Sequence, residues 1–532
     1  KLSSGTAVFE NCTVGAKYVE TMIVGGSSTV GGFVSFAEDC DLTFKNCVNY
    51  ADVAAQSGDK STGAYTGGFI GNTEYANVVI ANCVNGVYGE TFVQSNGSAA
   101  AGFIGNAYGN ITITDSVNYS RAITKGKENW APTAAGIIGL FANDSAQTHV
   151  LNLKGVKNYG DLETLDQWYQ GAGGIIGNAK SWNGVKSYIY IEDTANYGSL
   201  VKNGTGPNLG GFIGYTDGKI TELVIKNSQN YGDFRSNGNN SGFIGQVATK
   251  STVIENCQNY GDIRSHNNMA GGFAAWQSHD AMTLKDCANY GKIVSDSKYA
   301  AGFVSGVDSK NVNADGCVNY GVLAGKTDTA AIVHANGGTL TNCVNYGAIT
   351  VANANGKIFA IANDKMTIDA TCNNEGVLGY TEVATADDFM AMKAGGLYVL
   401  TANIVLPADY TAIDFGAEWY QAELDGNGYT VTLKSDNGAS IFNNLASAKI
   451  YNVNFKGSSD FTADQGFIAK EVVGAAKVAF EDVNVDAFIT GSKNAAAYVG
   501  KTSKTLVSFT AKNCTFTGLV HSASRAGAFA PK

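Results

Sequence analysis

A short motif recurs along most of this chain and limits the folds that it can adopt. Five near-copies read Cys-x-Asn-Tyr, and in four of them Gly follows. They are Cys47–Tyr50, Cys257–Gly261, Cys287–Gly291, Cys317–Gly321 and Cys343–Gly347. Degenerate copies replace Cys by another residue at Ser116–Tyr119, Val156–Gly160, Thr194–Gly198 and Ser228–Gly232. The later Asn residues, at positions 230, 259, 289, 319, 345 and 374, lie 26 to 30 residues apart. Self-similarity at a short period is typical of a solenoid.

A second signature lies between these marks. It reads Gly-Gly-Phe-Ile-Gly or a close variant at Gly67–Gly71, Gly102–Gly105, Gly173–Gly177, Gly210–Gly214 and Gly242–Gly245. A short alternating segment precedes the Cys-x-Asn-Tyr mark, with apolar pairs Val78/Ile80, Ile111/Ile113, Leu151/Leu153, Ile189/Ile191 and Leu223/Ile225. Alternation at period two indicates a strand with one face in a core and one in water.

We therefore predict an all-β chain that forms a right-handed parallel β-helix, with about three short strands per coil. The rest of each coil serves as the crossover that a parallel strand pair needs. A leucine-rich repeat is the competing solenoid, but its leucine pattern and helical half are missing. A β-propeller needs blades of ~40 to 45 residues, and the shorter, elastic spacing here favours the β-helix.

Stacking of such coils aligns equivalent side chains into columns. A column of Asn can hydrogen-bond along its own length, so we expect an Asn ladder. Its members would be Asn49, Asn118, Asn158, Asn196, Asn230, Asn259, Asn289, Asn319 and Asn345. The residue before Cys is repeatedly Asn or Asp, which favour turns, so we place a corner there. We expect the Gly after Tyr to supply a backbone angle that other residues avoid.

Nine of the ten Cys occupy equivalent places in the repeat, and Cys40 stands apart. We expect an inward Cys column of free thiols formed by Cys47, Cys83, Cys257, Cys287, Cys317, Cys343 and Cys372. Small residues such as Ser116 and Ser228 fill the same column, as expected of a packed site. Disulfides between coils remain an alternative, because stacked Cα atoms lie within the permitted distance of ~4.4 to 6.8 Å. There is no CxxC pair and the His are scattered, so we expect no metal site and no cofactor.

The repeat fades near residue 380. Residues 385–394 have a helical pattern in which Thr385 can cap the first turn with Asp388 as the box partner, and Gly395 ends it. Alternating β segments then resume. We expect a first domain over 1–380 and a second β-helix segment over 381–532 that opens with this helix. Both chain ends fall inside what looks like a repeat, so we expect a piece of a larger protein.

Composition excludes several classes of partner. The formal net charge is −10, without long runs of one sign, which argues against nucleic acid, whose binding needs a basic stripe. No segment approaches the ~20 apolar residues of a transmembrane helix. With 26 Tyr and 25 Phe, the chain is unlike disordered sequences.

These motifs resemble those of bacterial cell-surface proteins with GLUG-type parallel β-helix repeats, a type found in gut Bacteroidetes and Firmicutes. Residues 31–376 match the repeat, and residues 385–433 match the opening of a segment, Gly-Gly-x-Tyr-x-Leu-Thr followed by Asp-Gly-Asn-Gly. The resemblance implies the β-helix fold, export and an extracellular or cell-surface location. It implies no reaction.

Aromatic residues in the insertions between 120 and 190 are the candidate binding residues: Trp130, Trp168, Tyr169 and Trp182. Loops on one side of a solenoid often form its binding face. The alternative is that these rings pack the loops onto the rod. The Tyr of the repeat forms its own column; facing outward it could stack on sugar rings, and facing inward it would be core. The sequence leaves both open.

We predict a non-enzymatic extracellular structural or adhesive rod whose partners are glycans or other surface proteins, with oligomers allowed. The first alternative is a carbohydrate-active β-helix enzyme, either a polysaccharide lyase or a glycoside hydrolase, which needs paired acids. Only Asp161, Glu163 and Asp166, and Asp387 with Asp388, cluster in sequence; they read as a solvated loop and a helix first turn. A secreted or phage-type fibre subunit is the further alternative.

Overall fold

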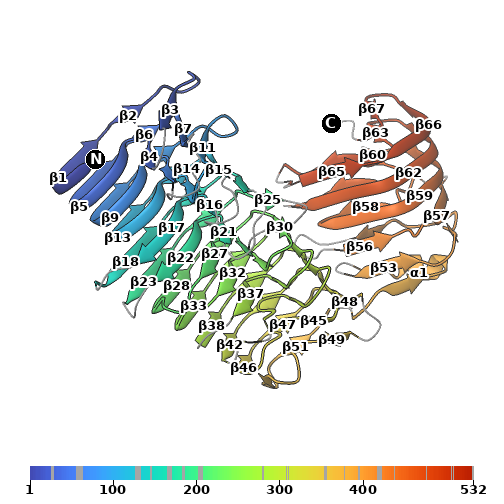
Figure 1. Cartoon of the computed structure of the whole chain (residues 1–532). Helices are drawn as coiled ribbons and strands as arrows, with labels where there is room; N and C mark the ends of the chain where they lie inside the picture. The colour runs from blue at the N-terminus through green and yellow to red at the C-terminus, as the bar shows by residue number, and fades with distance from the viewer. Residues whose placement is uncertain are drawn as a thin grey trace. The chain divides into compact units, whose positions relative to one another are not determined.

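A computed structural model of the chain describes most of its residues and consists of two compact units (Figure 1). The first unit comprises Lys1–Asn319, Leu323–Val344 and Val351–Asn373, and the second comprises Tyr320–Val322, Asn345–Thr350 and Asn374–Lys532. The described residues are 1–25, 29–55, 64–125, 133–143, 147–164, 171–181, 186–201, 208–277, 281–306, 308, 311–352, 356–376, 378–393, 396–415, 422–435, 438–474, 476–504, 506 and 508–529.

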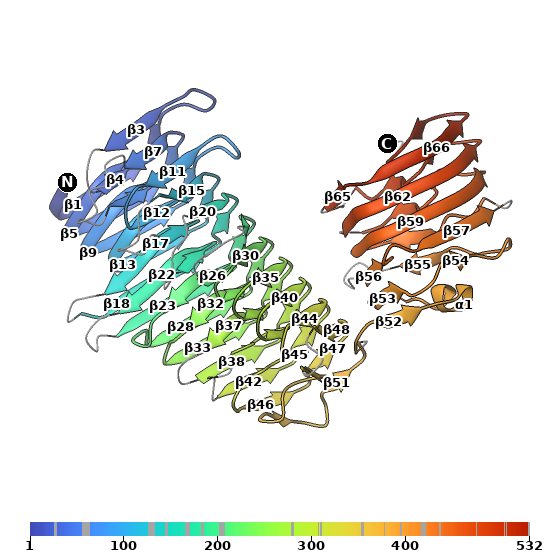
Figure 2. The ribbon, with the colours of Figure 1, turned by 45° about the vertical axis from the view of Figure 1, so that its right-hand side comes forward.

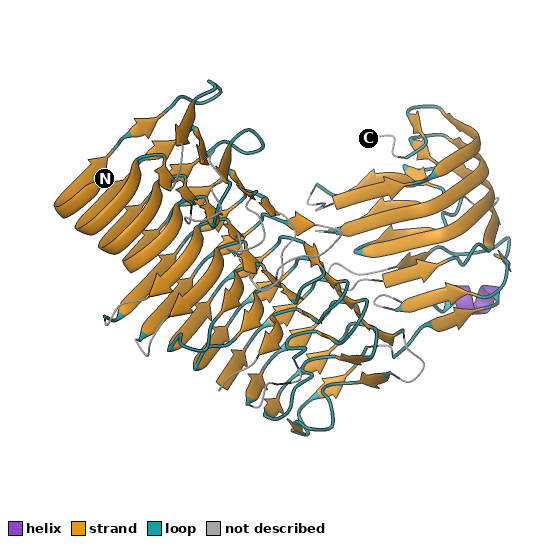
Figure 3. Ribbon diagram, in the orientation of Figure 1, coloured by secondary structure: helices purple, strands orange, loops and turns teal. Residues whose placement is uncertain are grey.

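The first unit is a stack of coils in which each strand pairs in parallel with its equivalent in the next coil, which confirms the predicted parallel β-helix (Figures 1 and 3). One coil contains β5 (Val34–Lys45), β6 (Val48–Asn49), β7 (Asp52–Ala55) and β8 (Tyr65–Gly67). Each coil thus contributes to four faces. The prediction of about three strands per coil missed the two-residue strand at the Asn mark, because the mark was taken as a turn.

The largest face is a 17-stranded sheet. Its first strands are long and continuous, and later coils divide the same path into two strands. With β5, it contains β1 (Leu2–Glu10), β9 (Ile70–Ala81), β13 (Ile104–Thr114), β17 (Ile138–Asn143), β18 (His149–Lys154), β22 (Ile176–Ser181), β23 (Ser187–Glu192), β27 (Ile213–Thr216), β28 (Glu222–Lys226), β32 (Ile244–Val247), β33 (Ser251–Glu255), β37 (Ala274–Gln277), β38 (Ala281–Lys285), β42 (Val312–Asp315), β46 (Thr339–Thr341) and β50 (Thr367–Ile368). The apolar pairs expected from alternation, from Val78/Ile80 to Leu223/Ile225, are all buried.

The Cys-x-Asn-Tyr motifs, with the equivalent positions of the other coils, form a 12-stranded sheet of two-residue strands. With β6, it contains β2 (Thr13–Val14), β10 (Val84–Asn85), β14 (Val117–Asn118), β19 (Lys157–Asn158), β24 (Ala195–Asn196), β29 (Gln229–Asn230), β34 (Gln258–Asn259), β39 (Ala288–Asn289), β43 (Val318–Asn319), β47 (Val344–Asn345) and β51 (Asn373–Asn374).

The third face consists of two sheets that follow the Asn marks along the chain. With β7, the first contains β3 (Met22–Gly25), β11 (Phe92–Ser95), β15 (Arg121–Thr124) and β20 (Leu162–Thr164). The second contains β25 (Leu200–Val201), β30 (Phe234–Ser236), β35 (Ile263–Ser265), β40 (Ile293–Ser295), β44 (Leu323–Gly325) and β48 (Ile349–Val351).

The fourth face is an 11-stranded sheet. Strands such as β8 end where the Gly-Gly-Phe-Ile-Gly signature begins. With β8, the sheet contains β4 (Thr29–Gly31), β12 (Ala99–Ala101), β16 (Thr133–Ala135), β21 (Gly171–Gly173), β26 (Asn208–Gly210), β31 (Asn240–Ser241), β36 (Ala270–Gly271), β41 (Ala300–Ala301), β45 (Asp328–Ala330) and β49 (Lys357–Phe359). The Phe of the signature points inward, and Phe212, Phe243, Phe273 and Phe303 stack in a buried column with ring centroids 4.6 to 4.8 Å apart.

The corner before Cys is confirmed by its backbone. Asn46, Asn82, Asp115, Asp193, Asn227, Asn256, Asp286 and Asn342 all have φ between 48° and 52°. Gly155 and Gly316 occupy the same corner in the coils that lack Asn or Asp there, also with positive φ. This left-handed conformation is open to Asn, Asp and Gly and disfavoured for other residues, which explains the composition of the position.

From Asn49 to Asn345, the Asn residues of the 12-stranded sheet are buried and hydrogen-bonded along the stack. The Nδ2 of Asn230 donates to the Oδ1 of Asn259 at 2.9 Å and to the carbonyl of Gly232 at 2.9 Å. Its Oδ1 accepts from the Nδ2 of Asn196 at 2.9 Å. Equivalent bonds of 2.8 to 2.9 Å run from Asn49 through Asn85, Asn118 and Asn158 to Asn196, and onward from Asn259 through Asn289 to Asn319. Asn345 bonds Asn374 at 2.6 Å. The sequence reading omitted Asn85, because its copy lacks the Tyr of the mark.

The Gly after Tyr does not supply the unusual backbone angle that was expected. None of the examples at 160, 198, 232, 261 and 291 has a positive φ. A Cβ on Gly261 would lie 1.9 Å from the carbonyl oxygen of Gly232 and 2.8 Å from the Nδ2 of Asn230. The second Gly of Gly-Gly-Phe-Ile-Gly is equally constrained: a Cβ on Gly211 would lie 2.3 Å from the Oδ1 of Asn230. Close approach of neighbouring coils to the Asn amide therefore excludes a side chain at both positions.

The inward Cys column packs as thiols. Cys47, Cys83, Cys257, Cys287, Cys317 and Cys343 are buried, while Cys372 is only half-buried. The Sγ of Cys257 donates to the carbonyl of Glu255 at 3.2 Å, and Cys343 makes the equivalent bond to Thr341 at 3.2 Å. Burial raises the pKa of Cys83 to about 11, so this thiol stays protonated and unreactive at neutral pH.

The second unit is also built from parallel strands around its own core (Figure 2). A nine-stranded sheet contains β52 (Thr381–Val383), β53 (Leu397–Leu400), β54 (Ile404–Val405), β56 (Ala422–Asp425), β57 (Thr430–Ser435), β59 (Ala448–Phe461), β62 (Lys477–Gly491), β65 (Ser508–Lys512) and β66 (Thr515–Ser522). Two smaller sheets contain β55 (Ile413–Phe415), β58 (Phe442–Leu445), β61 (Ala469–Val472) and β64 (Val499–Thr502), and β60 (Gln465–Gly466), β63 (Ala495–Ala496) and β67 (Ala526–Gly527).

The only helix among the described residues, α1 (Ala386–Met390), belongs to this unit. Thr385 caps it and Asp388 completes the capping box, as predicted. The helix is shorter than the expected 385–394, because its C-cap is Ala391; Gly395 lies outside the described residues. Phe389 anchors the helix in the core of the unit.

Replacing a ladder amide by a carboxylate tests the role of the buried ladder. Asn230→Asp cannot donate to Asn259 or to Gly232 and buries a charge. We expect it to lower the free energy of unfolding by about 3 kcal/mol or more. The matched control is Asn256→Asp at the exposed corner before Cys. Asn256 bonds Asn227 there at 2.8 Å, and other coils have Asp at the same corner. We expect this control to lose less than about 1 kcal/mol of unfolding free energy. Urea unfolding followed by circular dichroism measures both, and equal losses would contradict the ladder's role.

Glycine substitutions separate close approach from backbone angle. Gly89 has φ +76° and no heavy atom within 4 Å of an added Cβ, whereas Gly261 has the close contacts described above. Gly89→Ala should cost about 1 to 2 kcal/mol through strain, and Gly89→Asn less, because Asn tolerates that angle. Gly261→Ala should destabilise more than Gly89→Ala, and Gly261→Asn more still. Thermal unfolding of the four variants gives their order of stability. A Gly261→Asn variant more stable than Gly261→Ala would disprove the close-approach account.

Candidate functional site

The four aromatic residues expected to bind, Trp130, Trp168, Tyr169 and Trp182, lie outside the described residues, as does Asp166. The predicted Asn ladder and Cys column lie in the interior and belong to the fold. The described acids of the two sequence clusters, Asp161, Glu163, Asp387 and Asp388, are exposed. Asp161 accepts from the backbone N of Ser199 at 2.9 Å, and Asp388 from the backbone N of Thr385 at 2.9 Å.

The Tyr column lies on the outside of the first unit. Tyr119, Tyr159, Tyr197, Tyr231, Tyr260 and Tyr290 stack with ring centroids 4.5 to 5.2 Å apart. Tyr197 and Tyr231 are each 38% exposed, and burial raises the pKa of Tyr197 to about 12. Neighbouring rings cover the ring faces along this column, so its ring edges meet solvent. Sugar stacking needs a free face, which makes this column a packing element.

Near the C-terminal ends of the strands in the 17-stranded sheet, outward residues of opposite charge alternate from coil to coil. Lys154, Glu192, Lys226, Glu255, Lys285 and Asp315 follow one another in register. Lys154 pairs with Glu192 at 2.8 Å, and Lys226 pairs with Glu255 at 2.8 Å. The hydrogen bond from Lys226 lowers the pKa of Glu255. Each cation in this row is matched by a carboxylate.

A different arrangement occurs on the face formed by β30, β35 and β40. These strands end in a column of buried serines, Ser236, Ser265 and Ser295. The Oγ of Ser265 accepts from the backbone N of Asn268 at 2.9 Å and donates to the carbonyl of Gly238 at 2.7 Å. Ser295 makes the equivalent bonds to Lys298 and Asn268. The serines thus hold successive turns in register and position the residues that follow them.

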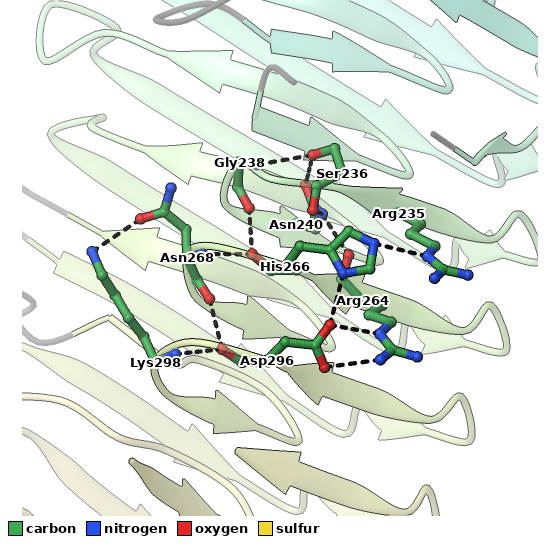
Figure 4. Close-up of polar contacts among 11 residues, drawn as sticks. Arg235, Ser236, Gly238, Asn240, Arg264, His266, Asn268, Asp296 and Lys298 are labelled. Atoms are coloured by element: carbon green, nitrogen blue, oxygen red, sulfur yellow. Dashed lines mark hydrogen bonds and ion pairs between the residues drawn. The ribbon is translucent and has the colours of Figure 1, made fainter. Parts of the chain in front are cut away.

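Four side chains form a hydrogen-bonded chain here: Arg235 from β30, Arg264 from β35, and His266 and Asp296 from the turns after β35 and β40 (Figure 4). The Nε of Arg235 donates to the Nε2 of His266 at 2.9 Å, and the Nδ1 of His266 lies 2.7 Å from the Oδ2 of Asp296. Arg264 binds both oxygens of Asp296, at 2.9 and 3.0 Å. Because the Nε2 of His266 accepts a hydrogen bond, its Nδ1 is the protonated nitrogen, and it donates a hydrogen bond to Asp296.

Electrostatics favours the ionised form of the Asp296 carboxyl group. Burial acts to raise the pKa of Asp296, but hydrogen bonds from Arg264 and His266 outweigh it and hold the pKa below its ordinary value. The carboxylate of Asp296 thus forms an ion pair with Arg264. Arg235 contacts His266 through Nε alone, and no ion pair of Arg235 occurs within the described ranges. Lys298 lies apart from the two arginines, where its ammonium donates to the amide oxygen of Asn268 at 3.0 Å (Figure 4).

Sequence reasoning missed this cluster because it treated the turns as variable loops. A signal was present: Asp233-Phe-Arg-Ser236 and Asp262-Ile-Arg-Ser265 repeat at one coil spacing. Only the register places Arg235 beside Arg264 and His266 beside Asp296.

A polar cavity of about 430 Å³ lies at the first coils, lined by Tyr18, Glu20, Tyr50, Asp52 and Glu90 among others. Burial raises the pKa of Asp52. Asp52 also accepts from the backbone N of Phe92 at 2.8 Å, as Asp233 does from Asp262 at 2.7 Å and Asp262 from Lys292 at 2.9 Å. These acids follow the Tyr mark at the same place in their coils, so Asp52 is a backbone anchor of the fold.

No family model, curated protein or solved structure matches the chain. Among the described residues, no group of three or more His, Cys, Asp or Glu is placed to hold a metal ion. The described part of the chain also has no helix of sufficient length and apolarity to cross a membrane.

Titration of Asp296 gives a test of the cluster. Its pKa is depressed in the folded state, so its contribution to stability is present above the ordinary pKa of 3.8 and is lost as pH falls through the folded value. We expect Asp296→Asn to lower the melting temperature at neutral pH, with a difference that persists to about pH 4 and then shrinks. Differential scanning calorimetry of both proteins across pH measures this. A difference that grows on acidification would contradict the assigned ion pair.

Proposed function

We propose that the chain is a non-enzymatic structural and adhesive rod, displayed outside the cell, that binds glycans or partner surfaces through outward side chains. The observation that carries the proposal is the Asn ladder. It uses the donors and acceptors of each buried amide within the stack, and it repeats from coil to coil. Such an interior supports an extended scaffold whose stability is a sum of contacts between neighbouring coils.

The division of labour among columns supports the same proposal. Asn, Cys, Phe and Gly columns serve packing, and the Tyr column covers its own ring faces. Outward turn positions vary from coil to coil, as on solenoids that bind through one face. The resemblance to GLUG-type surface proteins supports the extracellular location.

A carbohydrate-active enzyme is the second candidate, and the cavity at the first coils favours it. A carboxyl with a raised pKa beside other carboxyls is the pattern of a general acid in glycoside hydrolysis. The hydrogen bond of Asp52 to the next coil accounts for its burial without catalysis, so the rod remains the preferred function.

A glycan array and a polysaccharide-digestion screen, run side by side on the purified chain, test the proposal. We expect binding to at least one glycan class without release of oligosaccharides. Release that disappears in Asp52→Asn would contradict the rod and support the enzyme. Absence of binding throughout the array would contradict the adhesive role.

A further inference from the structure

The Arg235–His266–Asp296–Arg264 cluster brings two guanidinium groups to one place on the first unit. Arg235 and Arg264 contribute two cations, and Asp296 contributes one anion. Asp233 and Asp262, two residues before the arginines, accept hydrogen bonds from backbone N–H groups of the next coil. The charged row on the 17-stranded sheet differs, because its lysines pair with carboxylates, whereas Arg235 makes no ion pair among the described residues.

The geometry of the two arginines suits an oxyanion. Arg235 and Arg264 are direct partners in the parallel pairing of β30 and β35, which places their Cα atoms ~4.8 Å apart. Their guanidinium groups lie on the same side of the His266–Asp296 pair (Figure 4). Arg235 uses Nε for His266, which leaves both Nη atoms without a protein partner among the described residues. Two parallel N–H donors from a guanidinium match a carboxylate or a sulfate.

The surrounding contacts hold Arg235 ready for such a ligand. His266 fixes the Nε of Arg235, and Asp296 fixes His266, while the serine column holds both turns in register. Asp296 is itself occupied by Arg264 at two points, so it does not neutralise Arg235. A side chain oriented by its neighbours loses less conformational entropy when it binds.

The extent of the cluster selects the kind of ligand. Nucleic acids need a long basic surface and a basic domain, whereas here two arginines lie in adjacent coils of an acidic chain. The site therefore fits individual oxyanion groups of an acidic polymer, and not a nucleic-acid backbone.

We propose that Arg235 and Arg264 bind the carboxylate or sulfate groups of an acidic glycan on the face formed by β30, β35 and β40. This inference rests on the proposed adhesive function and names its ligand class and its site.

Binding of the full chain to four immobilised polysaccharides tests the inference: polygalacturonate, its methyl ester, dextran sulfate and dextran. The first and third carry the two candidate oxyanions, and the others are their neutral counterparts. We expect binding to polygalacturonate, dextran sulfate or both, and none to the neutral polymers. The preference between the two charged polymers assigns the source of the oxyanion. Binding should weaken as salt rises from about 0.01 M to about 1 M.

Matched variants assign the binding to the cluster. Arg235→Ala should weaken binding at least about tenfold, and Arg235→Lys should restore it only in part, because Lys lacks the planar fork. Lys226→Ala removes the same charge from the balanced row and should leave binding unchanged. Circular dichroism of each variant checks that the fold is intact.

Equal losses in Arg235→Ala and Lys226→Ala would overturn the site, since they would indicate a general charge effect. Binding to neutral glycans with none to either charged polymer would overturn this inference and leave the adhesive rod standing. Failure to bind any of the four polymers or any glycan on an array would count against both.

Discussion

The buried Asn amide is the interaction on which the coils of the first unit depend. A ladder Asn such as Asn230 links its coil to the coils before and after it and also bonds the backbone two residues ahead. Its amide lies so close to two Gly columns that a Cβ at either would collide with it or with a neighbouring carbonyl. The two sequence signatures, Cys-x-Asn-Tyr-Gly and Gly-Gly-Phe-Ile-Gly, are therefore two sides of one packing arrangement. Fully bonded buried amides stabilise the stack, whereas an unsatisfied one would be costly.

The outer faces follow a different rule, since solvent tolerates variation there. One row alternates Lys with Glu or Asp through successive coils, so the observed register places opposite charges beside each other. The Tyr column achieves regularity by stacking. The ends of β30, β35 and β40 and the turns after them depart from both patterns, and their serine column holds the turns that carry His266 and Asp296. Regular columns maintain the stack of coils, and irregular residues in register are the place where recognition can arise.

Periodicity alone predicted the architecture because a parallel β-helix repeats each local environment. The corner at the residue before Cys, the inward apolar pairs and the Thr385 cap all follow from local chemistry. The errors arose where the cause was not local. Gly after Tyr was assigned to a backbone angle, although a carbonyl from the adjacent coil excludes its side chain. Asn85 was missed because motif matching required a Tyr that the ladder does not need. The candidate cluster was missed because its members lie in separate coils, Arg235 and Arg264 on strands and His266 and Asp296 in the turns that follow strands.

The sequence by itself determined the all-β solenoid, its period and the columns that build it, because each of these depends on residues within a single coil. Tertiary structure decided the side chains that meet across coils. It placed the Tyr rings outside and face to face, and it brought Arg235 to His266 and Arg264 to Asp296. These contacts depend on the register between coils, which spacing in the sequence leaves open wherever insertions change the coil length. Position along the stack, and not proximity in sequence, therefore defines the candidate site.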